Sequence, residues 1–289
     1  MQTLMDVATL KDLVATDSTG RRTVVLDVRW ALGDPHGREH YLAAHLPGAV
    51  FVDLATELAG PADPRRGRHP LPAVEQFQAS VRAWGVRNGD VVVAYDDSGN
   101  LAAARLWWML RNAGFPDVYL LDGGLAAWRD AGFDLESGEP ETAPGDVELT
   151  GGAMPVIDAG QAASWGHQGL LLDARAGERY RGEFEPVDPR AGHIPGAVNA
   201  PTTANLGADG RFLSPATLRE RFTGLGVRAG VPTAVYCGSG VTAAHEIAAL
   251  EIAGFPAALY PGSFSEWSNN DSNPVVTGDA PYHDGSSSQ

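Results

Sequence analysis

The sequence predicts an α/β fold built from two similar domains, each with a central parallel sheet and helices on both faces. Two observations predict it. Four motifs recur in the same order along the 289 residues, and each half alternates short apolar runs with stretches of helical spacing. Such alternation is typical of a parallel sheet, because the connection between two parallel strands usually contains a helix that covers one face.

The repeat consists of four pairs of matching motifs. The paired landmarks are separated by 146 residues (Asp27 to Asp173), 148 (His45 to His193), 141 (Asp96 to Cys237) and 139 (Trp128 to Trp267). Landmarks that keep their order and nearly keep their separation indicate a duplicated domain.

The residue pattern also locates individual elements. In the first half, strands are expected at Thr23–Val28, Ala49–Leu54, Val91–Tyr95 and Val118–Leu121, and helices at Val74–Trp84, Ala102–Ala113 and Leu125–Ala131. In the second half an apolar run leads into Cys237, and a helix-like run follows at Ala243–Leu250. We therefore expect Cys237 at the carboxyl edge of a parallel sheet, where binding sites of this architecture usually lie.

Composition gives the domain boundaries. A segment rich in glycine, proline and glutamate at 136–152 is the natural linker between a first domain at 1–135 and a second at 153–278. The last residues, 279–289, are polar, and we expect a disordered tail there.

Charge and cysteine content restrict the class of protein. The chain is 44% hydrophobic and carries a net charge of −15, which disfavours binding to nucleic acid and to anionic membranes. No basic segment followed by an apolar run opens the sequence, so no signal peptide is visible. A single cysteine is typical of a reducing compartment, and we expect a cytoplasmic protein. The one basic cluster, Arg65–Pro70, is interpreted as a solvated or substrate-side loop.

The single cysteine, Cys237, has two interpretations: a buried small hydrophobe or a reactive thiol. Its neighbours favour the second. Gly238 and Gly240 let a tight loop point successive N–H groups at one anion, and Thr242 is a candidate N-cap for the following helix. Both features favour the thiolate, which is the nucleophilic form of cysteine.

Two other cysteine chemistries are disfavoured. A phosphatase loop of the Cys-x5-Arg type has an arginine where this chain has Ala243, and the sequence after the cysteine does not match papain-like enzymes. In the first half Asp96 occupies the position of the cysteine. That half therefore cannot form a thiolate and is predicted to be non-catalytic, with a loop that repels anions.

The motifs around Asp173, His193 and Cys237, together with the duplication, resemble the tandem rhodanese-domain sulfurtransferases, the family of 3-mercaptopyruvate and thiosulfate sulfurtransferases. The resemblance extends from about Val7 to Gly278. It implies that Cys237 takes a sulfur atom from a small donor, holds it as a persulfide and passes it to cyanide or a thiol. A low-molecular-weight thiol or thioredoxin would be such an acceptor, and no cofactor or metal is implied.

The resemblance also implies roles for residues around the cysteine. The loop residues Gly238, Gly240, Val241 and Thr242 would contact the donor, and Arg179 would bind its carboxylate or sulfonate. Ser239 would assist proton transfer on the donor.

Three further residues have open interpretations. His45 is either a catalytic partner of Ser239, with Asp34 as a weaker third member, or a structural residue that closes a turn. Trp30 is either an aromatic wall over the site or a core residue. By contrast, His193 is interpreted as structural. Asp173 and Arg175 are interpreted as struts within the domain, because Asp27 and Arg29 repeat them in the half that lacks the cysteine.

One departure from the family leaves the donor open. Mercaptopyruvate enzymes often carry a second arginine at the position occupied here by Val187, and Arg190 is the nearest substitute along the chain. The uncharged loop after Cys237 resembles that of the mercaptopyruvate-preferring members of the family, which implies 3-mercaptopyruvate as the donor, whereas the missing arginine leaves a thiosulfate preference open. A persulfide carrier or sensor loaded by a partner protein is a further alternative.

Overall fold

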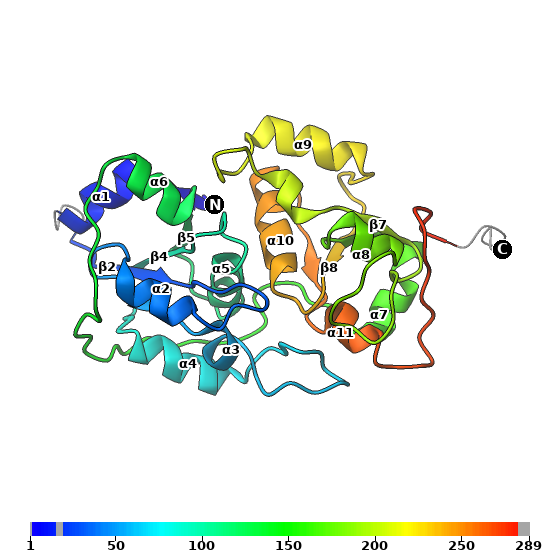
Figure 1. Cartoon of the computed structure of the whole chain (residues 1–289), viewed down its shortest axis with the longest axis horizontal. Coiled ribbons are helices and arrows are strands. Elements are labelled where there is room, and N and C mark those ends of the chain that lie inside the picture. The colour runs from blue at the N-terminus through cyan, green and yellow to red at the C-terminus, as the bar shows by residue number, and fades with distance from the viewer. Residues whose placement is uncertain (1, 16–19, 283–289) are drawn as a thin grey trace. The chain divides into compact units, whose positions relative to one another are not determined.

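The structure, a computed structural model shown in Figure 1, describes residues 2–15 and 20–282. The chain divides into two compact units. Unit 1 comprises Met1–Gly60, Leu71–Met154 and Leu206–Phe212, and unit 2 comprises Pro61–Pro70, Pro155–Asn205 and Leu213–Gln289. Each repeat thus contributes one short segment to the unit formed mainly by the other. The two segments, which begin 145 residues apart at Pro61 and Leu206, occupy equivalent places in the repeat.

Unit 1 contains a five-stranded sheet with the order β1-β5-β4-β2-β3, in which every pair of neighbours is parallel. Its strands are β1 (Leu4–Met5), β2 (Thr23–Asp27), β3 (Val50–Phe51), β4 (Val91–Tyr95) and β5 (Val118–Leu121). Its helices are α1 (Val7–Ala15), α2 (Gly37–Ala43), α3 (Leu54–Glu57), α4 (Val74–Ala83), α5 (Ala103–Asn112) and α6 (Gly124–Asp130).

Both faces of this sheet are covered. Val93 and Tyr95 of β4 pack in one apolar cluster with Leu10 of α1 and Trp128 of α6. The intervening residues of β4 are also fully buried, and α5 packs against β4 and β5. Successive strand residues point to opposite faces, so burial of every residue of β4 means that helices or loops cover the sheet on both sides.

Unit 2 contains a four-stranded parallel sheet with the order β7-β6-β8-β9. Its strands are β6 (Leu170–Asp173), β7 (Ala197–Asn199), β8 (Thr233–Tyr236) and β9 (Ala258–Leu259). Its helices are α7 (Ala159–Ser164), α8 (Gly177–Arg181), α9 (Pro215–Gly224), α10 (Thr242–Ile252) and α11 (Ser263–Trp267), with short 3₁₀ turns at Trp165–His167 and Thr202–Asn205 (Figure 1). The predicted fold class, two parallel α/β domains, is confirmed.

The predicted elements of the first half are present: β4 and β5 have the expected bounds, α6 begins and ends one residue earlier than expected, and the others are shorter. The largest difference is the strand expected at Ala49–Leu54, which is reduced to β3, Val50–Phe51. The chain turns there because the side chain of Asp53 accepts hydrogen bonds from the N–H groups of Ala55 and Thr56 and so caps α3. The pattern did not predict β1, α1, α2 or α3.

The segment expected as a linker, 136–152, packs along unit 1. The N–H groups of His45 and Glu136 each donate to the carbonyl of the other, both at 2.9 Å, and Gly145 donates to the carbonyl of Arg82 at 2.7 Å. Val147 is fully buried. The segment is therefore part of the unit 1 structure.

Part of the expected tail also has a defined position. The N–H of Gly196 donates to the carbonyl of Pro281 at 2.7 Å, which anchors the chain as far as residue 281. Residues 283–289 of the tail lie outside the described residues. Within the described ranges, 2–15 and 20–282, no helix has the length and apolar character required to cross a bilayer.

Candidate active site

Cys237 follows directly after β8, which lies between β6 and β9 near the centre of the unit 2 sheet. The loop 237–241 then leads into α10. The cysteine is 2% exposed. Its sulfur accepts a hydrogen bond from the N–H of Gly240, with a distance of 3.2 Å between nitrogen and Sγ. The chain therefore curls around the sulfur, as the spacing of the glycines predicts.

The two glycines of the loop serve different purposes. Gly240 has φ +78°, and a Cβ there would lie 2.5 Å from the carbonyl oxygen of Pro261. Only glycine tolerates both conditions. Gly238 does not have a positive φ. A Cβ on Gly238 would instead lie 3.1 Å from Nη2 of Arg68 and 3.4 Å from Nη1 of Arg179. Gly238 thus leaves open the space in front of two guanidinium groups.

The backbone of Cys237 is held by α11. Its N–H donates to the hydroxyl of Ser263 at 3.2 Å, and its carbonyl accepts from the N–H of Phe264 at 3.0 Å. The hydroxyl of Ser263 in turn donates to the carbonyl of Tyr260 at 2.8 Å. Ser263 is fully buried and has φ +54°, a left-handed conformation that is unusual for a residue with a side chain. This strain is stored beside Cys237.

The helix after the loop begins one residue earlier than predicted. Val241 is its N-cap and Thr242 its first residue, and no side chain caps it. The prediction of Thr242 as N-cap was therefore wrong, because the loop closes at Gly240 and not at residue 242. The first N–H groups of α10 still give the loop the partial positive charge of a helix start.

Ser239 has a histidine partner in unit 2. Nδ1 of His69 lies 2.8 Å from Oγ of Ser239. His69 belongs to the segment Pro61–Pro70, which packs with unit 2 although it lies in the first half of the sequence. Ser239 is 7% exposed, so this hydrogen bond is shielded from water on the serine side.

The same segment brings Arg68 to the site. Nη1 of Arg68 and Nη2 of Arg179 both donate to the carboxylate of Asp188, the second at 3.1 Å. Glu185 holds Arg179 from the other side through Nε and Nη2, at 3.1 and 2.7 Å. Both guanidinium groups have nitrogens within 3.5 Å of the position that a Cβ would take on Gly238, the residue next to the cysteine. An anion at that point would meet two positive charges.

A further ion pair supports this cluster from within the domain. Arg175 donates to Asp173 through Nε and Nη2, at 3.0 and 2.6 Å, and to the carbonyl of Gly192 at 2.7 Å. Its guanidinium also lies 3.9 Å from the ring centre of Phe264 and 3.4 Å from Glu185. In unit 1, Arg29 and Asp27 form the equivalent pair. Both are buried ion pairs within one unit, as expected for residues with a structural role.

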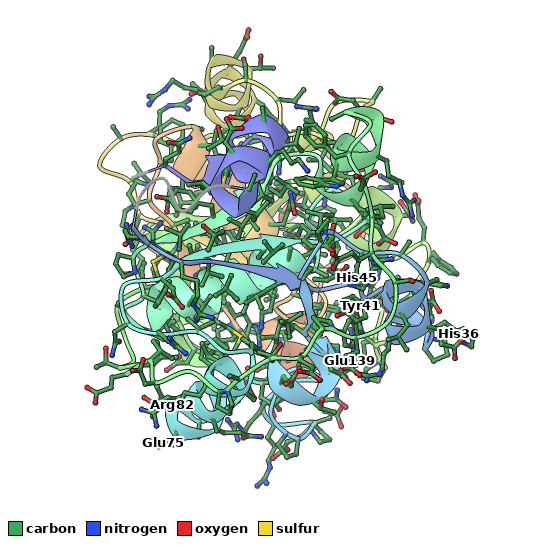
Figure 2. All side chains as sticks on the ribbon, turned by 90° about the vertical axis from the view of Figure 1, so that its left-hand side faces the viewer. His36, Tyr41, His45, Glu75, Arg82 and Glu139 are labelled. Carbon is green, nitrogen blue, oxygen red and sulfur yellow. The ribbon has the colours of Figure 1, made fainter. Side chains whose placement is uncertain are left out.

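The ring of His45 contacts Tyr41 of its own unit. Its Nδ1 lies 2.9 Å from the carbonyl of Tyr41, and its ring stacks on that tyrosine with centroids 4.2 Å apart (Figure 2). His193 has the same contacts with Tyr180, at 2.9 Å and with centroids 3.7 Å apart. The catalytic role considered for His45 is therefore not supported, because the hydroxyl of Ser239 is bonded to His69. For His193, burial lowers the pKa, which keeps the ring neutral.

Three further residues were candidates for the site, namely Arg190, Asp34 and Trp30. Arg190 donates to the backbone carbonyls of Trp267, Ser268, Asn270 and Asn273, so it holds the chain after α11 and is not available to a donor. Asp34, in unit 1, accepts from the N–H of His36 at 2.8 Å and lies 3.7 Å from His40. Trp30 is half-buried in unit 1. None of these observations supports the binding or catalytic roles considered for them.

Asp96 shows what the equivalent loop does in unit 1. Its buried carboxylate accepts hydrogen bonds from four backbone N–H groups, those of Ser98, Asn100, Ala102 and Ala103, at 2.7–3.0 Å. These N–H groups favour the charged form of Asp96, whereas burial raises its pKa. The centre of the loop is occupied by a carboxyl group of the chain itself, and repulsion of other anions by this loop stays a prediction. The same loop geometry in unit 2 leaves the centre to a sulfur atom.

Sequence reasoning did not identify Arg68 and His69. It interpreted the cluster at 65–70 as a solvated or substrate-side loop, without assigning a role to either residue. The available signal was that this is the one basic cluster of a strongly acidic chain. Nothing in the sequence indicates that the segment packs on the other repeat.

The chain matches the family model of the rhodanese-like domain twice, at residues 6–131 and 158–270. It is 51% identical over 263 residues to a Pseudomonas aeruginosa protein named "Probable 3-mercaptopyruvate sulfurtransferase", covering 89% of this chain and 93% of that one. It is 46% identical over 277 residues to SseB of Mycobacterium tuberculosis, which bears the name of a thiosulfate sulfurtransferase, with coverage of 94% and 97%.

A solved structure agrees. The crystal structure of SseA from Escherichia coli, described as a 3-mercaptopyruvate sulfotransferase, superposes with a TM-score of 0.80 at 32% identity, covering 91% of this chain and 99% of that one. Two matched domains, relatives that align over almost their whole length and a shared fold lead to one conclusion. The chain belongs to the tandem rhodanese-domain sulfurtransferase family.

Proposed function

We propose that the chain transfers a sulfur atom from 3-mercaptopyruvate, through a persulfide on Cys237, to a thiol or to cyanide. The observation that carries this proposal is the arrangement around one loop. The loop wraps the sulfur of Cys237, a histidine–serine pair adjoins it, and two guanidinium groups face it. These are a nucleophile, a proton-transfer pair and an anion-binding site.

Donor binding is assigned to Arg68 and Arg179. A carboxylate placed against Gly238 would accept hydrogen bonds from Nη2 of Arg68 and Nη1 of Arg179, the guanidinium atoms nearest to that glycine. Arg68 thereby supplies the second positive charge that the sequence lacks at Val187. Binding of the carboxylate there holds the rest of the donor near the cysteine loop.

Sulfur transfer from mercaptopyruvate then requires one proton movement. The thiolate of Cys237 attacks the donor's sulfur, an S–S bond forms, and the C–S bond breaks with its electron pair passing to carbon as the enolate of pyruvate. The proton of the donor's thiol finally reaches that enolate, leaving the persulfide anion and pyruvate. Ser239 and His69 form the pair that would move this proton. The N–H of Gly240 would stabilise the anion on sulfur.

Thiosulfate is the alternative donor, and it needs no proton. The thiolate displaces sulfite, which leaves with the electron pair of the broken S–S bond. The histidine–serine pair would be idle in that reaction. Its presence favours mercaptopyruvate, as does the absence of a basic residue in the loop 238–242.

Acceptor and location are proposed on the same basis. Cys237 is the single cysteine of the chain, so no second thiol is present to take the sulfur within the protein. An outside acceptor is required, and thioredoxin, a low-molecular-weight thiol or cyanide would serve. These acceptors and the reduced cysteine suit a cytoplasmic enzyme.

Steady-state rates with both donors, using cyanide or dithiothreitol as acceptor, test the proposal. We expect turnover with mercaptopyruvate, a mass gain of one sulfur atom (about 32 Da) on Cys237 after donor alone, and loss of both in Cys237→Ser. The matched control is Asp96→Ser in the equivalent loop, which should remain active if folded. No turnover with either donor, together with no mass gain, would refute the enzyme. A mass gain only when a partner protein delivers sulfur would support the persulfide carrier instead.

A further inference from the structure

Asp188 has a position that the proposed reaction does not yet explain. It is a carboxylate with a fully buried side chain, in a site that has to bind an anion. One of its oxygens accepts from Nη1 of Arg68 and the other from Nη2 of Arg179, at 3.1 Å for the second contact. The two arginines come from segments more than 100 residues apart in the sequence, and Asp188 is the group that joins them.

This contact fixes which atoms face the donor. Asp188 accepts from Nη1 of Arg68 and Nη2 of Arg179, and the other terminal nitrogens, Nη2 of Arg68 and Nη1 of Arg179, come nearest to the position of a Cβ on Gly238, at 3.1 and 3.4 Å, followed by Nη2 of Arg179 at 3.7 Å. Guanidinium groups are planar, so fixing one edge determines the direction of the opposite edge. Asp188 therefore orients both arginines toward the loop of Cys237.

The same carboxylate sets the charge of the site. The connected network contains three guanidinium groups and three carboxylates, namely Arg68, Arg175, Arg179, Asp173, Glu185 and Asp188. With all six ionised its net charge is zero. A donor with one negative charge would bring the network and donor together to −1, whereas a dianion would bring them to −2, with Asp188 repelling the donor in both cases.

We propose that Asp188 is a positioning and specificity-determining residue that orients Arg68 and Arg179 and disfavours doubly charged donors relative to singly charged ones. This inference rests on the proposed function and refines its donor specificity. Mercaptopyruvate carries one negative charge on its carboxylate, and thiosulfate carries two. The repulsion between Asp188 and a donor scales with the donor's charge, so it acts twice as strongly on thiosulfate.

The test is the ratio of kcat/KM for thiosulfate to kcat/KM for mercaptopyruvate in Asp188→Asn. The amide keeps the size of the side chain and removes its charge. Poorer orientation of the arginines lowers both values, but removal of the negative charge favours the dianion, so the ratio should rise about tenfold. A purely structural role would lower both values equally and leave the ratio unchanged.

Two further variants make the result decisive. Glu183→Gln removes an equal charge from an exposed ion pair with Arg181 and should leave the ratio within about twofold of wild type, since exposed charges are screened. Glu185→Gln removes the other carboxylate on Arg179 and should shift the ratio in the same direction as Asp188→Asn, which keeps the test valid if the latter variant does not fold. An unchanged or lower ratio in the folded variants would overturn the inference. A wild-type protein without turnover or persulfide would instead overturn the proposed function.

Discussion

Nδ1 of His69 lies 2.8 Å from Oγ of Ser239, although the two residues are 170 positions apart and belong to different repeats of the sequence. The contact exists because the segment Pro61–Pro70 packs with unit 2. It connects the imidazole of His69 with a hydroxyl two residues from Cys237.

The first prediction concerns this pair. His69→Ala and Ser239→Ala should each lower kcat for mercaptopyruvate about 100-fold, because the proton transfer to the enolate is lost. The double variant should be no slower than either single variant, since the two groups act as one unit. Rates with thiosulfate should change little. Ser98→Ala, at the position equivalent to Ser239 in unit 1, is the control. Equal losses with both donors would argue against a role in proton transfer.

The second prediction concerns the arginines. Arg179→Ala and Arg68→Ala should raise KM for mercaptopyruvate by about one to three orders of magnitude, because each removes a charge-assisted contact worth about 1.5–3 kcal/mol. Arg181→Ala is the control, because Arg181 pairs with Glu183 on the surface and should leave KM unchanged. An unchanged KM in Arg179→Ala would remove that residue from the donor site.

The third prediction concerns the strained serine beside the nucleophile. Ser263 has φ +54°, and the equivalent residue of unit 1, 139 positions earlier, is Gly124 with the same φ. Both Ser263→Gly and Ser263→Ala remove the hydroxyl that accepts from the N–H of Cys237, but the glycine variant should relieve the strain whereas the alanine variant should keep it. We expect the alanine variant to be less stable than the glycine variant by about 1 kcal/mol in urea unfolding. Equal stability would indicate that the backbone at 263 is not strained.

The fourth prediction concerns stability and pH. Burial raises the pKa of Glu246 in α10 from 4.5 to about 7, although Arg221 and a 2.6 Å hydrogen bond from Asn205 favour the charged form. The folded state therefore prefers the protonated acid. The resulting stabilisation is present below the unfolded pKa of 4.5 and is lost as the pH rises to about 7.

Glu246→Gln removes this titration. Its free energy of unfolding relative to wild type should therefore increase between pH 5 and pH 8, by up to about 3 kcal/mol. Urea unfolding at several pH values measures the difference. Glu220→Gln, on the exposed face of α9, should show no such trend. A pH-independent difference for Glu246→Gln would mean that its carboxyl group has an ordinary pKa in the folded protein.

The sequence by itself determined the two-domain parallel α/β architecture. Strands and helices bury apolar residues at characteristic spacings, and these spacings are visible in short stretches of sequence. It also identified Cys237 as the candidate nucleophile. Cys237 is followed by Gly238 and Gly240, which are a local signal of a tight loop, and the repeat places Asp96 at the equivalent position. The departure at Val187 was equally visible, and it raised the question of a second positive charge at the proposed donor site.

Only the tertiary structure decided which side chains surround that nucleophile. His45 and Arg190 lie in motifs close to those of the family, yet His45 stacks on Tyr41 and Arg190 holds backbone carbonyls near α11. Arg68 and His69 instead reach the loop of Cys237 from the other repeat. The physical reason is that the segment Pro61–Pro70 packs where its side chains find partners that are distant in the sequence. Arg68 pairs with Asp188, and His69 pairs with Ser239. Such complementarity leaves no periodic or local signal in the sequence.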